Sequence, residues 1–304
     1  MLRRFFVAGA AGAALLFSIQ RARGAVFAQY VPGSYTQGTF SSSYELQFNN
    51  PLIVNPTLDA PNAQTAGGNP AGLTGQPGFT EFAFPSIVSP FSPPYDTDQL
   101  VTLGIGGSIT LHFPQTINVT AAPTIGVFTG AGLFDTSSDG SGLADSSGDA
   151  FVSYQAIVNV SKDGATWKSL GLLTFGNPEN YYNNAVTPYD DSAPANPSVA
   201  DYGKPFTGTD LSFANENFQQ IITTLNGSAG GNWLDLSASG LSQVNYIQFT
   251  EPNGQVPDGT LLALQAVTVS ENLPEPACAA GLLVCAGLLA RRRKGAKRSR
   301  RRPA

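Results

Sequence analysis

The chain has 304 residues, of which 42% are hydrophobic and 12% charged, so it can bury the core of one large domain or two small ones. Its 33 glycines and 22 prolines disfavour long helices and predict an all-β fold with many loops. Between residues 25 and 273 only three lysines oppose 20 acidic residues, a formal charge of −17, which excludes nucleic acid as a partner of this segment.

The N-terminus has the pattern of a secretory signal peptide. Two arginines precede an apolar run over residues 5–17, and small residues follow it. This order predicts export through the inner membrane and removal of residues 1–24 by signal peptidase. A cut after Ala28 is the alternative, because Val26 would then occupy the −3 position.

The middle of the chain, residues 25–273, carries a strand pattern. Apolar and polar residues alternate with period two in these stretches: 44–48, 99–103, 108–113, 124–128, 151–160, 243–250 and 261–269. Clusters of Gly, Pro, Asn and Ser separate them, with long loops at 62–78 and 189–205. This spacing predicts one two-sheet antiparallel β-sandwich, jelly-roll-like in its connectivity.

Two local signals fall inside this domain. Asp163-Gly164 lies between the stretch ending near Val160 and the one around Trp167, which predicts a hairpin turn. Between residues 218 and 225 the apolar residues follow helical spacing, and Asn226-Gly227 supplies a stop. We therefore expect at most one short helix in the domain.

A cluster of acidic residues follows the stretch 124–128. Asp135, Asp139, Asp145 and Asp149 are interleaved with Ser and Gly, and hard oxygen ligands of this kind suit calcium. The spacing matches neither the EF-hand nor the glycine-rich calcium repeat. The alternative is a surface loop in which the carboxylates cap their own backbone in Asx-turns.

Few residues in the domain suggest chemistry. Catalysis by a Ser-His-Asp or Cys-His arrangement needs a histidine, and the chain has only His112, which alternates with the apolar residues 109, 111 and 113 and is therefore expected on the outer face of a strand; both cysteines lie beyond residue 273. Trp167 and Trp233 could stack on sugar rings if they are exposed, and the alternative is that they belong to the core. Paired carboxylates could in principle hydrolyse glycosides, but no pair stands out in the sequence.

The C-terminus, residues 274–304, has three parts. Pro274-Glu275-Pro276 comes first, an uncharged apolar segment 277–290 follows, and a basic run begins with Arg291, Arg292, Arg293 and Lys294. As a helix, the 14 apolar residues would span about 21 Å, less than the ~30 Å hydrocarbon core. The basic run would stay cytoplasmic by the positive-inside rule, so we expect a transient membrane segment with the domain outside.

This three-part tail resembles the PEP-CTERM sorting signal of Gram-negative-type bacteria. The resemblance implies that an exosortase in the membrane recognises the tail and processes the chain near Pro274-Glu275-Pro276. The tail departs from the family pattern in its two cysteines and in its longer basic extension.

The domain is also similar to ectodomains that precede such tails. The similar segments are GGSITLHF, VNVSKDGATWKSL, GSAGGNWLDLS, VNYIQF and LLALQAVTVSENLPEP. The resemblance implies a galactose-binding or discoidin-like sandwich, which indicates a fold more than an activity.

Together these patterns predict a surface-sorted protein of the cell envelope, cell surface or extracellular matrix, without catalytic activity. The first alternative is a carbohydrate-binding module, with or without calcium, whose partner would be an exopolysaccharide. The second alternative is a polysaccharide hydrolase or lyase.

Overall fold

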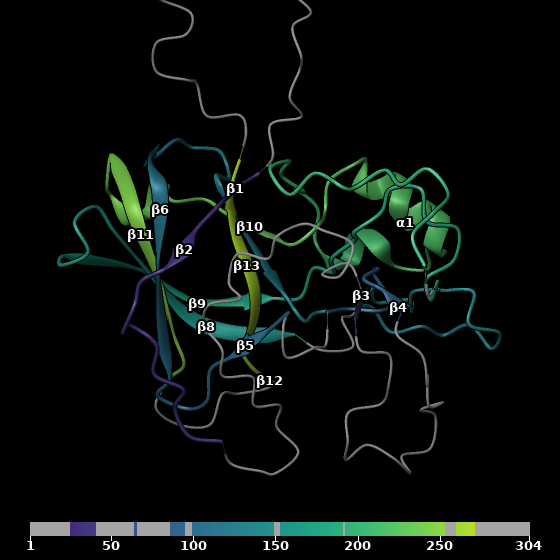
Figure 1. Ribbon diagram of the computed structural model, residues 1–304, viewed down its shortest axis with the longest axis horizontal. Coiled ribbons are helices and arrows are strands. Elements are labelled where there is room, and N and C mark those ends of the chain that lie inside the picture. The colour runs from purple at the N-terminus through teal and green to yellow at the C-terminus, as the bar shows by residue number, and fades with distance from the viewer. Residues whose placement is uncertain are drawn as a thin grey trace, which may run out of the picture.

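The structure is a computed structural model, and it describes residues 25–40, 64–65, 86–94, 99–148, 153–190, 192–252 and 260–270. The described residues form a two-sheet, almost entirely antiparallel β-sandwich with one short α-helix, as the sequence predicts (Figure 1). The small β3–β4 pair (Gln64–Thr65 and Ser86–Ile87) lies outside both sheets.

The first sheet, called sheet A here, has the strand order β1-β13-β7-β10, and β5 also pairs with β13. Its strands are β1 (Val26–Phe27), β5 (Val101–Thr102), β7 (Ile125–Thr129), β10 (Asn232–Leu234) and β13 (Ala263–Val269). Val26 lies opposite Val269, and Val269 lies opposite Ile125. The first and last strands of the domain are therefore neighbours.

The second sheet, sheet B, has the order β12-β8-β11-β6-β2, with β9 paired to β8. Its strands are β2 (Gln29–Tyr30), β6 (Ser108–Asn118), β8 (Tyr154–Ser161), β9 (Trp167–Phe175), β11 (Gln243–Thr250) and β12 (Thr260–Leu261). The short β12–β8 pair is parallel. The chain passes repeatedly from one sheet to the other, from β6 to β7 to β8 and again from β9 to β10 to β11, as the strands of a sandwich do.

The main core lies between the two sheets. Period-two alternation on β6 buries Ile109, Leu111 and Phe113, while His112 faces outward, half-buried, with its ring 4.7 Å from that of Tyr246. The alternation read from the sequence is confirmed on this strand.

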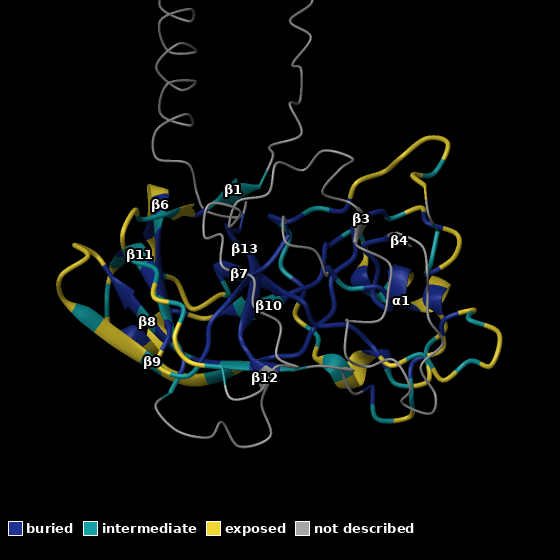
Figure 2. Cartoon of the chain, turned by 60° about the horizontal axis from the view of Figure 1, so that its bottom comes forward, coloured by how far each residue is buried: buried dark blue, intermediate teal, exposed yellow. Residues whose placement is uncertain are grey.

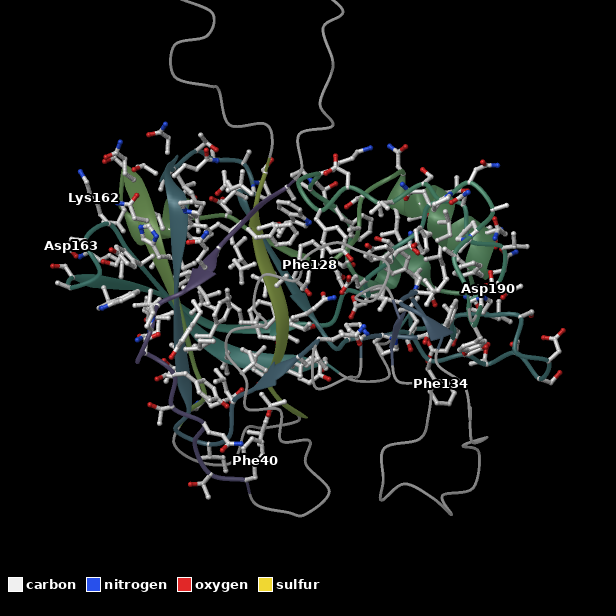
Figure 3. The ribbon with its side chains drawn as sticks, in the orientation of Figure 1. Phe40, Phe128, Phe134, Lys162, Asp163 and Asp190 are labelled. Atoms are coloured by element: carbon white, nitrogen blue, oxygen red, sulfur yellow. The ribbon has the colours of Figure 1, made fainter. Side chains whose placement is uncertain are left out.

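Sheet A is covered on its other face as well, which the sequence analysis did not predict. A second apolar cluster packs there, and it joins Phe128 of β7 and Ala266 of β13 to α1 (Phe218–Leu225) and to the aromatic residues of 181–218. Figure 3 labels Phe128 between the sheet and this third layer. Figure 2 shows the buried strands of sheet A with α1 on the side away from sheet B. β7 and β13 are consequently buried along their whole length.

The helix α1 forms where the spacing predicted it. Asn217 caps its N-terminus, since the Asn217 side chain accepts from the Gln220 N–H (3.1 Å) and Gln220 Oε1 accepts from the Asn217 N–H (2.9 Å). Asn226 ends it in the left-handed conformation, with φ of 50°.

The predicted hairpin is also present. β8 and β9 pair, and Asp163 Oδ1 accepts hydrogen bonds from the N–H groups of Ala165 and Thr166 at 2.9 and 2.7 Å. Lys162 and Asp163 lie at the tip of this hairpin in Figure 3.

None of the helices among the described residues is long and apolar enough to cross a membrane. The predicted signal peptide, the strand expected at 44–48, and the apolar and basic parts of the tail lie outside the described residues.

Candidate functional site

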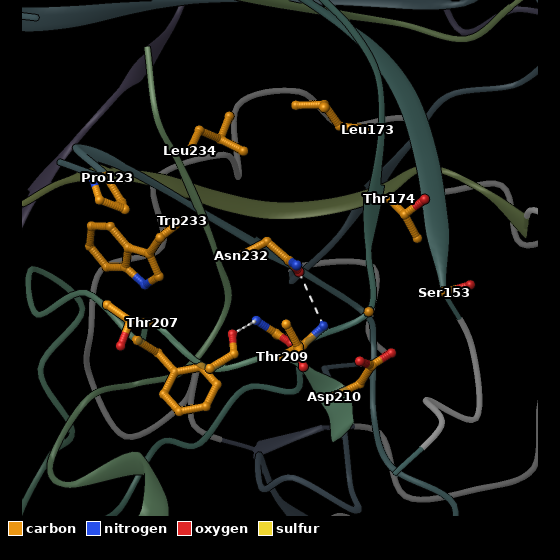
Figure 4. Close-up of a pocket in the computed structure, with 14 residues that line it drawn as sticks. Pro123, Ser153, Leu173, Thr174, Thr207, Thr209, Asp210, Asn232, Trp233 and Leu234 are labelled. Atoms are coloured by element: carbon orange, nitrogen blue, oxygen red, sulfur yellow. Dashed lines mark hydrogen bonds between the residues drawn. The ribbon is translucent and has the colours of Figure 1, made fainter. Parts of the chain in front are cut away.

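A cleft of about 670 Å³ lies where the two sheets and the third layer meet (Figure 4). β10 of sheet A, the end of β9 in sheet B and the loop 206–210 contribute its walls. Volumes of roughly 300–1,000 Å³ are typical of small-molecule sites. In Figure 4, Trp233 and Thr207 lie on one side of the cleft, and Asp210, Ser153 and Thr174 on the other.

Asn177 ties the walls of the cleft together. Its N–H donates to Asn232 Oδ1 (3.1 Å), and its Nδ2 donates to the carbonyl oxygens of Gly231 (3.1 Å) and Gly208 (3.4 Å). These bonds link β10, the end of β9 and the loop 206–210, so the cleft is pre-formed rather than a gap between independent loops.

Trp233 occupies its place because Gly126 faces it across β7 and β10. A Cβ at Gly126 would lie 2.9 Å from Trp233 Cζ2, so only glycine leaves room for the indole ring. The ring packs edge-on against Phe128, with 6.4 Å between centroids, and its Nε1–H donates to the Gly230 carbonyl (2.9 Å). Trp233 is half-buried, so it is both part of the third layer and a wall of the cleft.

The cleft combines polar and apolar groups, and Asp210 carries the one carboxylate among the described residues that line it. Asp210 Oδ1 accepts from the Leu211 N–H (2.9 Å) at the start of the 3₁₀ helix Asp210–Phe213. The described residues that line the cleft include hydroxyls and amides but no Lys, Arg or His. Such a surface can exchange hydrogen bonds with a neutral polar ligand, and it offers nothing to neutralise an anion.

The acidic loop uses its carboxylates locally. Asp135 Oδ1 accepts from the N–H groups of Ser137 (2.8 Å) and Leu143 (3.0 Å), and Oδ2 accepts from the Tyr189 hydroxyl (3.0 Å). Partial burial would raise the pKa of Asp135, but these hydrogen bonds outweigh it and lower the pKa. Tyr189 thus fixes the loop to the third layer.

Asp139 and Asp145 form Asx-turns with the N–H groups of Ser141 (3.0 Å) and Ser147 (2.9 Å). Among the residues that the structure describes, no group of three His, Cys, Asp or Glu side chains is placed to hold a metal ion. Asp149 lies outside the described residues, and calcium binding stays a prediction for this loop.

Trp167 does not border the cleft. It begins β9 at the hairpin, opposite Ser161, and is half-buried. The structure therefore separates the two tryptophans proposed as stacking residues, and of the two Trp233 is the one that lines this cleft.

The sequence analysis did not predict the buried carboxyl of Glu179. Glu179 is 1% exposed beneath sheet A, and its Oε1 accepts from the Tyr202 hydroxyl and from Gln265 Nε2 (3.0 Å). Burial raises the pKa of Glu179 to about 7, although these two hydrogen bonds oppose the shift. Glu179 Oε2, Gln265 Oε1 and the Asn180 side-chain amide find no hydrogen-bond partner in the described part of the chain.

The sequence analysis also missed the polar residues that surround Trp233. Asn177, Thr207 and Asp210 lie 23 or more positions before Trp233 in the chain, and loops without periodicity bring them together. Only the pair Asn232-Trp233 could have drawn attention to this region.

The sorting residues Pro274, Glu275 and Pro276 and the topology residues 291–294 lie outside the described residues. No protein-family model matches the chain, and no curated protein matches it significantly.

Proposed function

We propose that this protein is exported and then sorted by an exosortase to the cell surface or extracellular matrix, where it acts without catalysing a reaction. The observation that carries the proposal is the order of the tail: Pro274-Glu275-Pro276, the uncharged segment 277–290, and the basic run from Arg291. A signal peptide at the other end and a strongly acidic domain between them are consistent with this route.

The ends of the domain support the same proposal. β1 begins at Val26, two residues after the predicted cut at Gly24, and β13 ends at Val269, five residues before Pro274. Processing at either position would leave the β1–β13 pair complete. The chain enters β1 and leaves β13 at the same end of this strand pair, because Val26 lies opposite Val269.

The test is replacement of Glu275 by Gln in the host bacterium, with Glu271→Gln as the matched control outside the motif. We expect Glu275→Gln to change the mass of the mature chain and its distribution between membrane and medium, and Glu271→Gln to change neither. Unchanged mass and location in both Glu275→Gln and a deletion of residues 277–290 would show that the tail is not a sorting signal.

A second candidate function is carbohydrate binding, with an exopolysaccharide as partner. The observation that favours it is the half-buried Trp233 in the wall of a cleft that also carries amide, hydroxyl and carboxylate groups. Aromatic faces next to convergent hydrogen-bonding groups are typical of sites for small polar ligands.

A further inference from the structure

We infer that the cleft beside Trp233 binds a neutral, polyhydroxylated ligand such as an uncharged oligosaccharide, and that it discriminates against acidic polysaccharides. This inference rests on the second candidate function and adds the location of the site and the charge class of the ligand.

The first argument is the inventory of hydrogen-bonding groups. Within the described part of the chain, Asn177 Oδ1 and Asp210 Oδ2 accept no hydrogen bond, and Asn232 Nδ2 donates none. The hydroxyls of Thr207 and Thr209 add groups that both donate and accept. A cleft that offers both acceptors and donors matches a ligand that carries many hydroxyls, since each hydroxyl also does both.

The second argument is burial. Asn177 is only 7% exposed, and its Nδ2 is held by two carbonyl oxygens, so its amide cannot rotate to suit a ligand. A fixed acceptor in a concave wall selects partners by position and costs little entropy on binding.

The third argument is charge. Asp210 is a carboxylate, no cationic side chain is among the described residues that line the cleft, and the domain carries a formal charge of −17. A uronate or sulfate group entering the cleft would lose water without gaining a counter-charge, and would meet Asp210. A neutral sugar avoids this cost, and its C–H groups can pack on the electron-rich face of Trp233.

An extended peptide is a poorer fit for the same place. A peptide strand would have to pair along β10 and the segment that leads into it, and residues 177–180 already pair with that segment at residues 229–231. The Gly231 N–H donates to the Pro178 carbonyl (3.1 Å), and the Asn180 N–H donates to the Ala229 carbonyl (3.0 Å). These backbone groups directly before β10 are thus occupied, which shortens the edge that a peptide strand could use.

The experiment measures binding to the full chain, purified in a detergent without sugar headgroups, by quenching of tryptophan fluorescence and by calorimetry. The probes are a panel of neutral oligosaccharides (cello-, manno- and galacto-hexaose), hexagalacturonate as the acidic counterpart, and an extended Thr/Val peptide. The variants are Trp233→Phe, Asp210→Asn and, as matched control, Trp167→Phe. Thermal unfolding of each variant establishes that it is folded.

We expect at least one neutral hexaose to bind, and hexagalacturonate and the peptide not to bind. Asp210→Asn or Trp233→Phe should raise the Kd about tenfold, the loss expected when one hydrogen bond to a charged group is weakened or one stacking surface is reduced in size. Trp167→Phe should leave the Kd unchanged. The inference would be overturned if hexagalacturonate or the peptide bound more tightly than the neutral hexaoses, or if neither cleft variant changed the Kd. Either result would place the binding of a carbohydrate or a peptide at another site on the protein. Failure of every glycan to bind would overturn the second candidate function too, and would leave the sorting proposal untouched.

Discussion

The buried carboxyl of Glu179 should make the stability of the domain depend on pH. Its pKa is raised from 4.5 to about 7 by burial, and its two hydrogen-bond partners, Tyr202 and Gln265, carry no positive charge. At a pH between these two pKa values, the folded protein therefore keeps a proton on Glu179 that the unfolded chain has already released. The stabilisation is fully present below pH 4.5 and is lost as the pH rises through about 7.

The magnitude follows from the two pKa values. Because of this proton, the unfolding free energy of the wild type should fall by about 2–3 kcal/mol between pH 5 and pH 8. Glu179→Gln keeps the acceptor for Tyr202 and removes the titrating carboxyl. The unfolding free energy of the variant should therefore rise by this amount relative to that of the wild type between pH 5 and pH 8. Glu216→Gln is the matched control, because Glu216 is half-buried just before α1 and its carboxylate likewise accepts from a neutral hydroxyl, that of Thr224.

Urea unfolding at several pH values between 5 and 8 measures the difference. Glu251 is also buried, with its pKa raised to about 7, but it contributes equally to the wild type and the variant and cancels from the comparison. Parallel stability curves for the wild type and Glu179→Gln, or a wild type more stable at pH 8 than at pH 5 relative to the variant, would refute the reasoning.

Three further outcomes are expected. Gly126→Ala should destabilise the domain by about 1–3 kcal/mol in urea unfolding and alter the fluorescence of Trp233. The reason is that the new Cβ would lie 2.8 Å from Thr268 Oγ1 and 2.9 Å from Trp233 Cζ2. An unchanged unfolding midpoint and an unchanged emission spectrum would contradict this packing. Asn217→Ala should cost about 1 kcal/mol by removing the cap of α1, whereas Asn217→Asp should restore most of it; equal losses in both would argue against the cap. Mass spectrometry of the exported protein should find Ala25 at the mature N-terminus, because a cut after Ala28 would remove β1 and a residue that is 0% exposed; a chain beginning at Gln29 would contradict it.

The sequence predicted the elements whose pattern is local. The helix over 218–225, the turn at Asp163-Gly164 and strand β11 (Gln243–Thr250) each carry their own periodicity and stop signals, and all three are confirmed. Strand β9 was harder, because a bulge opposite Val158 and Asn159 interrupts its alternation.

The third layer could not be predicted for a physical reason. Apart from α1, much of its core comes from irregular segments, where side chains such as Tyr181 and Tyr202 are buried outside any strand or helix. The cleft could not be predicted for the same reason, since irregular loops bring Asn177 and Asp210 close to Trp233. Glu179 gave no signal either, because an isolated glutamate in a loop is ordinarily exposed.

The position of the cleft connects the two proposals. Leu234, which lines the cleft, lies opposite Ile125, and Ile125 lies opposite Val269 at the end of β13. Two strand spacings, about 10 Å, therefore separate the cleft from the strand that leads into the tail. Only three residues stand between Ser270 and Pro274, and an extended chain of that length reaches at most about 14 Å. A tail still held in a bilayer would keep the cleft close to the membrane surface, where long polymers have restricted access. Release by processing near Pro274-Glu275-Pro276 would remove that restriction, so sorting and ligand binding would be consecutive steps rather than independent properties.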